Sequence, residues 1–222
     1  DSLKTAPPVF SFKLSTEEGE YLSDSVVLAT GTKQRRLDVP GIERFLGNSV
    51  FYHCVLAGKK FLRKKVFVVG GRNTGAISAI YLKDLGCNVE IIEKDPQLNA
   101  KDKYKERINA LSIPTRLNTT VESLEGDDSL KKVRLRTPNG LEEVSADGMF
   151  VCIGLIPNND LARGLRLKLN PEGYICVNEH MATSVPGVFA AGDITGNLKQ
   201  IAVANAQGLI AMYNINKYLK RQ

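Results

Sequence analysis

The spacing of apolar residues predicts a chain that begins with strands and then alternates strands with helices. Residues 9–22 alternate between apolar and polar side chains, which predicts two strands that turn at Glu18–Glu20. The apolar run Val26–Ala29 predicts a buried strand. Residues 66–93 predict a strand, a glycine turn, a helix that ends at Gly86 and a second strand. This order is a βαβ unit, whose two strands lie parallel in one sheet.

The rest of the chain continues this pattern. Residues 100–111 predict a second helix, residues 113–154 predict further strands, and "GYICV" and "GVFAAGD" predict short strands near the end. Residues 198–219 predict a final helix, because apolar and small residues recur there at helical spacing and mark one packed face. The residues of that face are Ile201, Ala204, Gly208, Ala211, Ile215 and Leu219. The element order predicts an α/β fold with a Rossmann-like nucleotide-binding domain.

The glycine turn of the βαβ unit, "GGRNTG", is the first candidate site. In a dinucleotide-binding turn the first glycine makes the bend, the second lets the pyrophosphate touch the backbone, and the third lets the helix pack on the strand. Gly70 and Gly75 hold the first and third places, but Arg72 holds the second. The Arg72 side chain either blocks the nucleotide or folds outward and pairs with phosphate as a charged clamp. Crowding at a backbone-contact position favours blockage or weak binding.

Residues around this turn are candidates for nucleotide contact. Gly71 belongs to the turn, and Asn73 and Thr74 are candidate caps of the helix, whose first amides and positive dipole favour an anion. Glu93 ends the second strand about 20 residues further on, where an acidic side chain bonds a ribose 2′-hydroxyl and repels a 2′-phosphate. This position predicts NADH rather than NADPH. The alternative is an ordinary charged residue that closes a strand.

Four motifs, in order, resemble those of the thioredoxin reductase family of flavin and pyridine-nucleotide proteins. They are "SVVLATGTKQRRLDVPG", "FVVGGRNTGA", "GMFVCIGLIPNND" and "TSVPGVFAAGDITGNLKQIAVANAQG". The resemblance covers nearly the whole chain. It implies that an NAD(P)-binding domain of residues 41–152 is inserted in an FAD-binding domain, of which residues 1–40 and 153–222 are parts.

The closing motif also suits a cofactor on chemical grounds. An apolar strand leads to Gly192 and Asp193, at the sheet edge where ligands bind in open α/β folds, and the Asp193 carboxylate can accept a hydrogen bond from a ribitol or ribose hydroxyl. The amides of Lys199, Gln200 and Ile201 at the start of the last helix favour negative charge. By the resemblance, Asp193, Gln200 and Ile201 contact FAD. The two crossover motifs add four candidate cofactor contacts: Thr30, Gly31, Ile153 and Gly154.

The sequence departs from the family at the redox dithiol. The family's CxxC, followed by Asp and Gly, falls on "HCVLAG", where His53 and Leu56 replace the cysteines and Ala57 replaces the acid. Cys54 lies beside the motif, so disulfide exchange has neither an attacking thiolate nor a resolving partner at this place. His53 is either a proton donor near the flavin or a packed or surface histidine, and the second alternative is the more common.

Two other family features are missing. The basic pair at the family's 2′-phosphate position is "EKD" here, and the opening βαβ unit of the FAD domain, with its glycine fingerprint, is absent. We therefore expect either a fragment of a longer flavoprotein or a chain that another chain completes, with weak FAD binding on its own.

Composition narrows the class of protein. With 222 residues and 43% hydrophobic content the chain can bury a core. No apolar run approaches the roughly 20 residues that cross a bilayer, and the start lacks the features of a signal peptide, so we expect a soluble, cytoplasmic protein. Four cysteines without CxxC spacing and two histidines argue against a metal site.

The net charge of +6 comes from short basic clusters such as "RKK" at residues 63–65. Solvated faces explain them, or a docking surface for an acidic electron-carrier protein, because opposite charges speed encounter. Nucleic acid is disfavoured, since the basic residues are not interleaved with aromatics. The resemblance implies a homodimer.

The sequence thus predicts an FAD-dependent oxidoreductase of the thioredoxin reductase type that lacks the dithiol. Its reductant is NADH or a protein donor such as ferredoxin. The alternative is a catalytically lapsed member of the family that serves as a binding or regulatory subunit.

Overall fold

The computed structural model describes residues 12–220 and divides the chain into two compact units. The central unit is Gln34–Gly154, and the terminal unit is built from both ends of the chain, up to Lys33 and from Leu155 onward. Each unit is described by itself. Residues 9–11, which the alternating pattern assigns to the first strand, lie outside the described residues.

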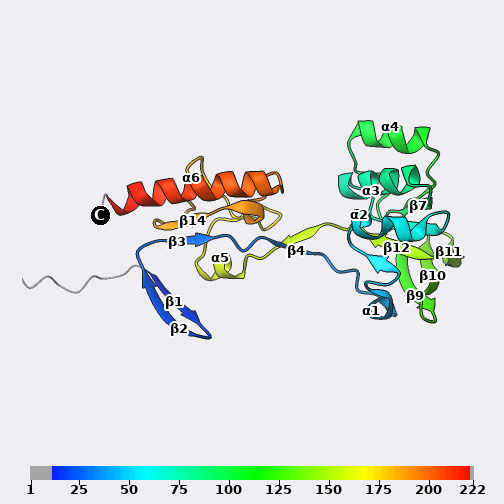
Figure 1. The fold of residues 1–222 in the computed structure, drawn as a ribbon, viewed down its shortest axis with the longest axis horizontal. Coiled ribbons are helices and arrows are strands. Elements are labelled where there is room, and N and C mark those ends of the chain that lie inside the picture. Colours follow the sequence, from blue (N-terminus) through cyan, green and yellow to red (C-terminus); the bar gives the residue numbers. More distant parts are fainter. Residues whose placement is uncertain (1–11, 221–222) are drawn as a thin grey trace, which may run out of the picture. The chain divides into compact units, whose positions relative to one another are not determined.

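The central unit is organised around a five-stranded parallel sheet (Figure 1). The strands lie in the order β5 (Val50–Phe51), β12 (Gly148–Val151), β6 (Lys65–Val69), β7 (Asn88–Ile92) and β8 (Thr115–Arg116). Helix α3 (Asn73–Asp84) connects β6 to β7, and helix α4 (Asp102–Ala110) connects β7 to β8. The predicted α/β fold and its βαβ unit are therefore confirmed.

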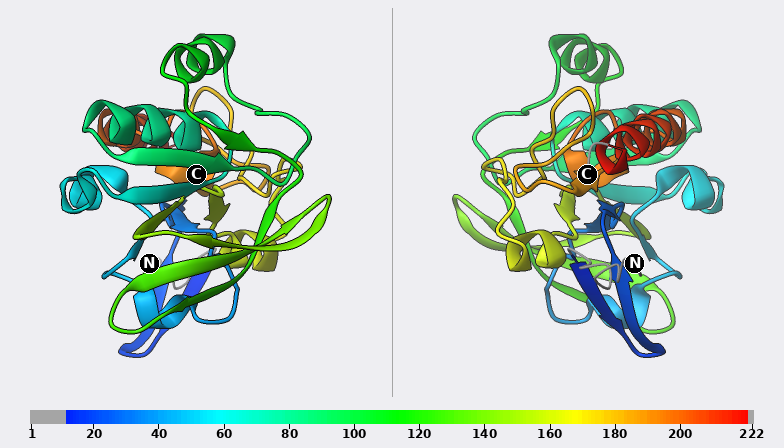
Figure 2. Two further views of the ribbon diagram at one scale, coloured as in Figure 1. Left: turned by 90° about the vertical axis from the view of Figure 1, so that its right-hand side faces the viewer. Right: turned by 90° about the vertical axis from the view of Figure 1, so that its left-hand side faces the viewer.

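The two faces of this sheet are covered differently, as Figure 2 shows. Val66 and Val68 of β6 pack with α3 and α4, whereas Phe67 and Val69 point to the opposite face, because side chains alternate along a strand. An antiparallel sheet covers that opposite face. Its strands, in spatial order, are β11 (Gly140–Ser145), β10 (Leu130–Thr137) and β9 (Thr120–Gly126).

Short helices precede the parallel sheet. They are α1 (Ile42–Phe45), α2 (Cys54–Ala57) and the 3-10 turn η1 (Gly58–Phe61). Phe61 anchors η1, because its ring packs edge-on against Phe150 at 5.6 Å and against Phe51 at 6.0 Å between centroids. The aromatic cluster thus fixes the segment that would carry the family's dithiol.

The terminal unit contains a hairpin, a small parallel sheet and the last helix. The hairpin is β1 (Phe12–Thr16) with β2 (Gly19–Ser23), and β3 (Val26–Leu28) pairs in parallel with β14 (Val188–Ala190). β4 (Thr32–Gln34) pairs with β13 (Leu155–Pro157). The unit also holds α5 (Asp160–Gly164), the 3-10 turn η2 (Gly192–Thr195) and α6 (Ile201–Leu219).

Two details of the terminal unit correct the sequence prediction. "GYICV" makes only an isolated bridge between Leu169 and Ile175, because the Ile175 N–H bonds the carbonyl oxygen of Ile194. Ile201 and Leu219 do not belong to a packed face of α6, since both are exposed. The buried positions are Gln207 and Ala211. A polar residue lies inside because the Gln207 Oε1 atom accepts a hydrogen bond from the backbone N–H of Gly192.

No helix within residues 12–220 is both long enough and apolar enough to cross a membrane. In the same stretch, no three His, Cys, Asp or Glu side chains gather in a way that would hold a metal ion.

Candidate nucleotide-binding site

The glycine turn between β6 and α3 has the geometry that two of its glycines require. Gly70 has a φ of 112°, and a side chain there would press against the carbonyl group of Cys152, whose carbon atom lies 2.9 Å from the added Cβ. A Cβ on Gly75 would collide with the carbonyl of Gly70, so helix and strand approach too closely for any other residue. The protein backbone itself therefore needs glycine at the first and third positions of the fingerprint.

Arg72 occupies the second position without backbone strain. Its φ and ψ are −85° and −178°, an extended conformation that any residue adopts, and it is the N-cap residue of α3. The side chain is exposed and makes no hydrogen bond or ion pair to the described part of the chain. A glycine at this place would serve only a ligand, because nothing in the fold demands one.

The predicted helix caps are corrected. No side chain caps the first turn of α3, and the Oδ1 atom of Asn73 instead accepts the backbone N–H of Lys101 at 2.9 Å. Thr74 is exposed and bonds none of the described residues through its hydroxyl. The first amides of α3 are thus left to water or to an anion.

Glu93 lies inside the protein at the end of β7, with 5% of its surface exposed. Its Oε2 atom accepts a hydrogen bond from the backbone N–H of Gly71, and its Oε1 atom accepts the N–H of Asp95 at 2.9 Å. A Cβ on Gly71 would lie 2.8 Å from that Oε2 atom, so glycine is needed here for the carboxylate to lie beneath the turn. Glu93 therefore holds the turn in place.

A cavity of about 500 Å³ opens beside this turn. Val69, Ile92 and Cys152 line it from the carboxyl ends of β6, β7 and β12, the edge where ligands bind in open parallel sheets. Three predicted site residues line it: Gly70, Glu93 and Ile153. Gly71, Asn73, Thr74 and Gly154 belong to the same unit but do not line it.

Several lining residues escaped the sequence analysis. They are Arg35, Leu37, Lys94, Asp95, Thr119, Thr120 and Val121. Arg35 reaches the cavity because its backbone N–H bonds the carbonyl oxygen of Gly154 at 3.0 Å, which joins segments far apart in the sequence. For Lys94 and Asp95 a signal existed, since both directly follow Glu93.

The charges around the cavity favour an anionic ligand. Arg35, Arg72 and Lys94 line it, and of these only Lys94 forms an ion pair in the described chain, at 3.8 Å to Asp95. The Glu93 carboxylate faces two backbone donors. Two guanidinium groups are therefore free to meet phosphate oxygens, which they bind well as planar donors.

Cys152 forms part of the cavity wall as a protonated thiol. Burial raises the pKa of the Cys152 thiol to about 11, and its Sγ atom lies 3.5 Å from the Ser78 hydroxyl oxygen. A thiol with so high a pKa is a poor nucleophile at neutral pH. Burial likewise raises the pKa of Cys87.

The segment that aligns with the family's dithiol is present as α2. His53 is exposed at its N-cap, and Cys54 is half-buried against the core on the α3 side of the sheet. No disulfide joins cysteines in the described part of the chain. Val55 and Leu56 are exposed here.

The terminal unit brings the closing motif together around the start of α6. The helix begins at Ile201 with Gln200 as N-cap, and a Cβ on Gly192 would lie 3.6 Å from that of Ala204 in the first turn. Asp193 follows Gly192 in η2, is half-buried, and its carboxylate bonds no other described group. Lys199 is turned aside, since its Nζ atom lies 4.7 Å from the centre of the Tyr174 ring.

The first crossover is fixed by a reciprocal pair of hydrogen bonds. The Thr30 hydroxyl donates to the carbonyl oxygen of Asn158 at 2.7 Å, and the Asn158 side-chain amide donates to the carbonyl oxygen of Thr30 at 2.8 Å. Gly31 follows with a φ of 64° and accepts the Asn158 N–H. Thr30 and Gly31 are thus held in the terminal unit, whereas Ile153 and Gly154 belong to the central unit.

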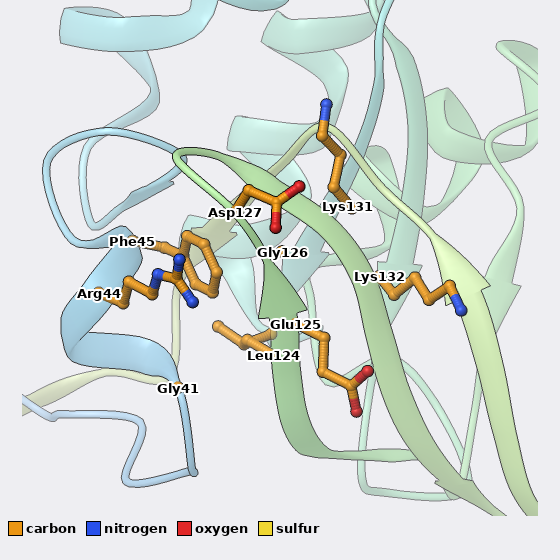
Figure 3. Close-up of a pocket in the computed structure, with 9 residues that line it drawn as sticks. All are labelled: Gly41, Arg44, Phe45, Leu124, Glu125, Gly126, Asp127, Lys131 and Lys132. Carbon is orange, nitrogen blue, oxygen red and sulfur yellow. The ribbon is translucent and has the colours of Figure 1, made fainter.

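A second hollow, of about 440 Å³, lies between α1 and the β9–β10 hairpin. Figure 3 shows Arg44 and Phe45 projecting from α1 toward β9. Its charged residues are exposed and of both signs, Arg44, Lys131 and Lys132 with Glu125 and Asp127. It contains none of the predicted site residues.

Comparison with known proteins agrees with this geometry. The family described as pyridine nucleotide-disulphide oxidoreductase matches residues 5–208. An NADH dehydrogenase of Ferdinandcohnia aciditolerans is 38% identical over 216 residues, which are 94% of this chain and 41% of that protein. A second relative, from the alkyl hydroperoxide reductase of Staphylococcus aureus, is 34% identical over 218 residues, which are 95% of this chain and 42% of that protein.

Two solved structures are similar across the chain. The thioredoxin reductase of T. acidophilum has a TM-score of 0.76 at 34% identity and is matched over 94% of this chain and 69% of its own. The thioredoxin reductase of Lactococcus lactis has a TM-score of 0.79 at 27% identity, over 95% and 71%. The chain therefore spans about two fifths of these curated relatives and about two thirds of these thioredoxin reductases. This chain belongs to the pyridine nucleotide-disulphide oxidoreductase family, whose members bind FAD and NAD(P)H.

Proposed function

We propose that this chain is part of a thioredoxin reductase-like flavoprotein oxidoreductase in which electrons pass through FAD without a dithiol. The observation that carries the proposal is the cavity at the carboxyl edge of the central sheet, beside a glycine turn and two unpaired guanidinium groups. The central unit is its pyridine-nucleotide domain, inserted in an FAD domain to which the terminal unit contributes.

The central cavity suits NADH. The free amides at the start of α3, with Arg35 and Arg72, supply donors for a pyrophosphate. Each carboxylate oxygen of Glu93 accepts one backbone N–H and has a second lone pair, so the side chain can still accept a ribose hydroxyl. Its negative charge opposes a 2′-phosphate, which supports NADH over NADPH.

The terminal unit suits the sugar-alcohol arm of FAD. Asp193 offers a carboxylate that no described group uses, beside Gly192 with its φ of 80° and the uncapped start of α6. A negative charge near those amides is stabilised by the helix dipole. When bound, FAD supplies the chemistry that accepts a hydride and releases electrons singly or in pairs.

The dithiol position assigns the acceptor to another class of molecule. With His53 and Leu56 in place of the two cysteines, electrons cannot leave through a disulfide at this site. The reductant is NADH or an acidic protein donor such as ferredoxin, and the acceptor lies outside thiol exchange.

An anaerobic absorbance spectrum of the intact gene product, purified without denaturation, tests this function. Flavin bands that bleach with NADH or with reduced ferredoxin support it; a colourless protein, or bands that neither donor bleaches, contradicts it. Asp193→Asn should lower the flavin content, whereas the exposed Glu172→Gln should leave it unchanged.

A second candidate function is a catalytically lapsed member of the family that acts as a binding or regulatory subunit. Arg72 at the edge of the cavity favours it, because a long side chain stands where the pyrophosphate approaches the backbone. A colourless protein that binds neither FAD nor NADH in a titration would be the result expected of this candidate.

A further inference from the structure

The segment from His53 to Lys64 replaces the dithiol loop with a rigid, apolar and basic platform. Three of its large side chains are exposed: Val55 at 69%, Leu56 at 84% and Leu62 at 49%. Soluble proteins expose single apolar residues commonly, but three within eight positions form a patch, and such patches mark interaction sites.

The platform is rigid because its other residues are buried. Ala57, Gly58 and Phe61 are buried, and Phe61 is fixed between Phe51 and Phe150. A Cβ on Gly58 would lie 3.0 Å from the Leu82 side chain of α3, so the segment packs tightly against that helix. Val55, Leu56 and Leu62 are therefore exposed because the core holds the backbone, and not because the segment lacks contacts.

Cations surround the apolar residues. Lys59, Lys60, Arg63 and Lys64 are exposed, and none of them belongs to an ion pair between the described residues. The sequence contains no Asp or Glu between Glu43 and Asp84, so no acid from this stretch offsets the charge.

The position of Arg63 is set by the backbone. Its φ is 62°, an uncommon value for arginine, and its N–H bonds the carbonyl oxygen of Gly86 at 3.0 Å. The next turn is held as well, since the Lys64 carbonyl oxygen accepts the N–H of Asn88 at 2.9 Å. These bonds hold the two cations at the end of the platform.

We propose that this platform is the docking surface for an acidic electron-carrier protein, with Val55, Leu56 and Leu62 at the centre of the contact and Lys59, Lys60, Arg63 and Lys64 at its rim. An apolar centre within a charged rim is the usual anatomy of a protein interface, and opposite charge on the partner speeds encounter. That the partner carries electrons rests on the proposed function; the surface and the acidity of the partner rest on the geometry.

Other polyanions suit the platform less well. Single-stranded nucleic acid is bound by aromatic stacking, and no exposed Phe, Tyr or Trp lies between His53 and Lys64. Attachment to a membrane surface uses a long amphipathic helix with aromatic side chains on its apolar face. Here α2 has four residues.

The test is a binding titration of the intact protein with a purified acidic ferredoxin, both oxidised, at low and at moderate ionic strength. Lys59→Glu with Lys64→Glu should weaken binding about tenfold or more and flatten its dependence on salt. The matched control is Lys101→Glu with Lys103→Glu, which changes the net charge equally at exposed positions near α4 and should weaken binding less than about threefold. Leu56→Ser should weaken binding, whereas Leu141→Ser, exposed at 60% on β11, should not.

Three results would overturn the proposal. They are no ferredoxin binding by the folded protein, equal loss from both lysine pairs, and binding to duplex DNA or to phosphatidylglycerol vesicles that Lys59→Glu with Lys64→Glu abolishes instead. Because the titration needs no electron transfer, a protein that binds ferredoxin but is never reduced would contradict the proposed function and leave the docking surface standing.

Discussion

The carboxylate of Glu93 accepts a hydrogen bond from the backbone N–H of Gly71, so the end of β7 holds the glycine turn that follows β6. The same carboxylate bonds the N–H of Asp95, and Glu93 is almost fully buried. An acidic residue at this position therefore has a structural role in addition to any contact with a ribose.

Glu93→Gln should destabilise the protein. A glutamine amide presents one oxygen and one NH₂ group, so one of the two backbone donors would face another donor and lose its partner. We expect the free energy of unfolding in urea to fall by about 1–3 kcal/mol. Glu106→Gln, at an exposed position of α4, is the control and should change it little. Equal stability of both variants would mean that Glu93 does not hold the turn.

Arg72→Gly should strengthen NADH binding. The backbone of Arg72 is unstrained, so removal of the side chain clears the path of the pyrophosphate without disturbing α3. An increase in affinity of about tenfold corresponds to about 1.4 kcal/mol and is measurable by fluorescence titration. Weaker binding would instead identify Arg72 as a phosphate clamp, and an unchanged affinity would show that its side chain does not meet the nucleotide.

Two glycine-to-alanine changes should have opposite effects on stability. Gly75→Ala places a Cβ against the carbonyl of Gly70, which cannot move without breaking the turn, and should cost about 3 kcal/mol. Gly208→Ala lies within α6, where the added Cβ meets nothing within 4 Å, and should stabilise by about 0.5–1 kcal/mol. Thermal unfolding of both variants checks the pair. A destabilised Gly208→Ala in the intact protein would show that another segment packs on that face of α6.

The sequence predicted the βαβ unit because both of its signals are local. The apolar strands stand out by period, and Gly70 and Gly75 mark the turn between strand and helix. The short helices α1 and α5 were missed because four or five residues make too little periodic pattern to recognise.

The rest of the site depends on contacts between distant segments. Asn73 was expected to cap α3, but its side chain bonds Lys101, which only the folded chain brings near. Arg35 lines the cavity because its backbone bonds that of Gly154. The inner face of α6 was misplaced because Gln207, a polar residue, is buried by its bond to Gly192. No spacing rule contains such pairs.

The Cys152 thiol should make stability fall at alkaline pH. Its pKa is about 11 in the folded protein, where burial opposes the thiolate, against an ordinary value of 9.0. As the pH rises from 9 toward 11 the unfolded chain loses this proton first, so the stabilisation is complete below pH 9 and is lost as the pH rises through the folded pKa. Two pKa units correspond to about 2.7 kcal/mol.

Cys152→Ala isolates this effect from the other groups that titrate in the same range. The free energy of unfolding of the wild type minus that of Cys152→Ala should be constant from pH 7 to pH 8.5 and then decrease by about 2–3 kcal/mol by pH 11. Tyrosines, lysines and Cys87 are the same in both proteins, so their titration cancels in the difference. A difference that stays flat to pH 11 would mean that the thiol ionises at its ordinary value, and that water reaches the wall of the cavity which Cys152 forms.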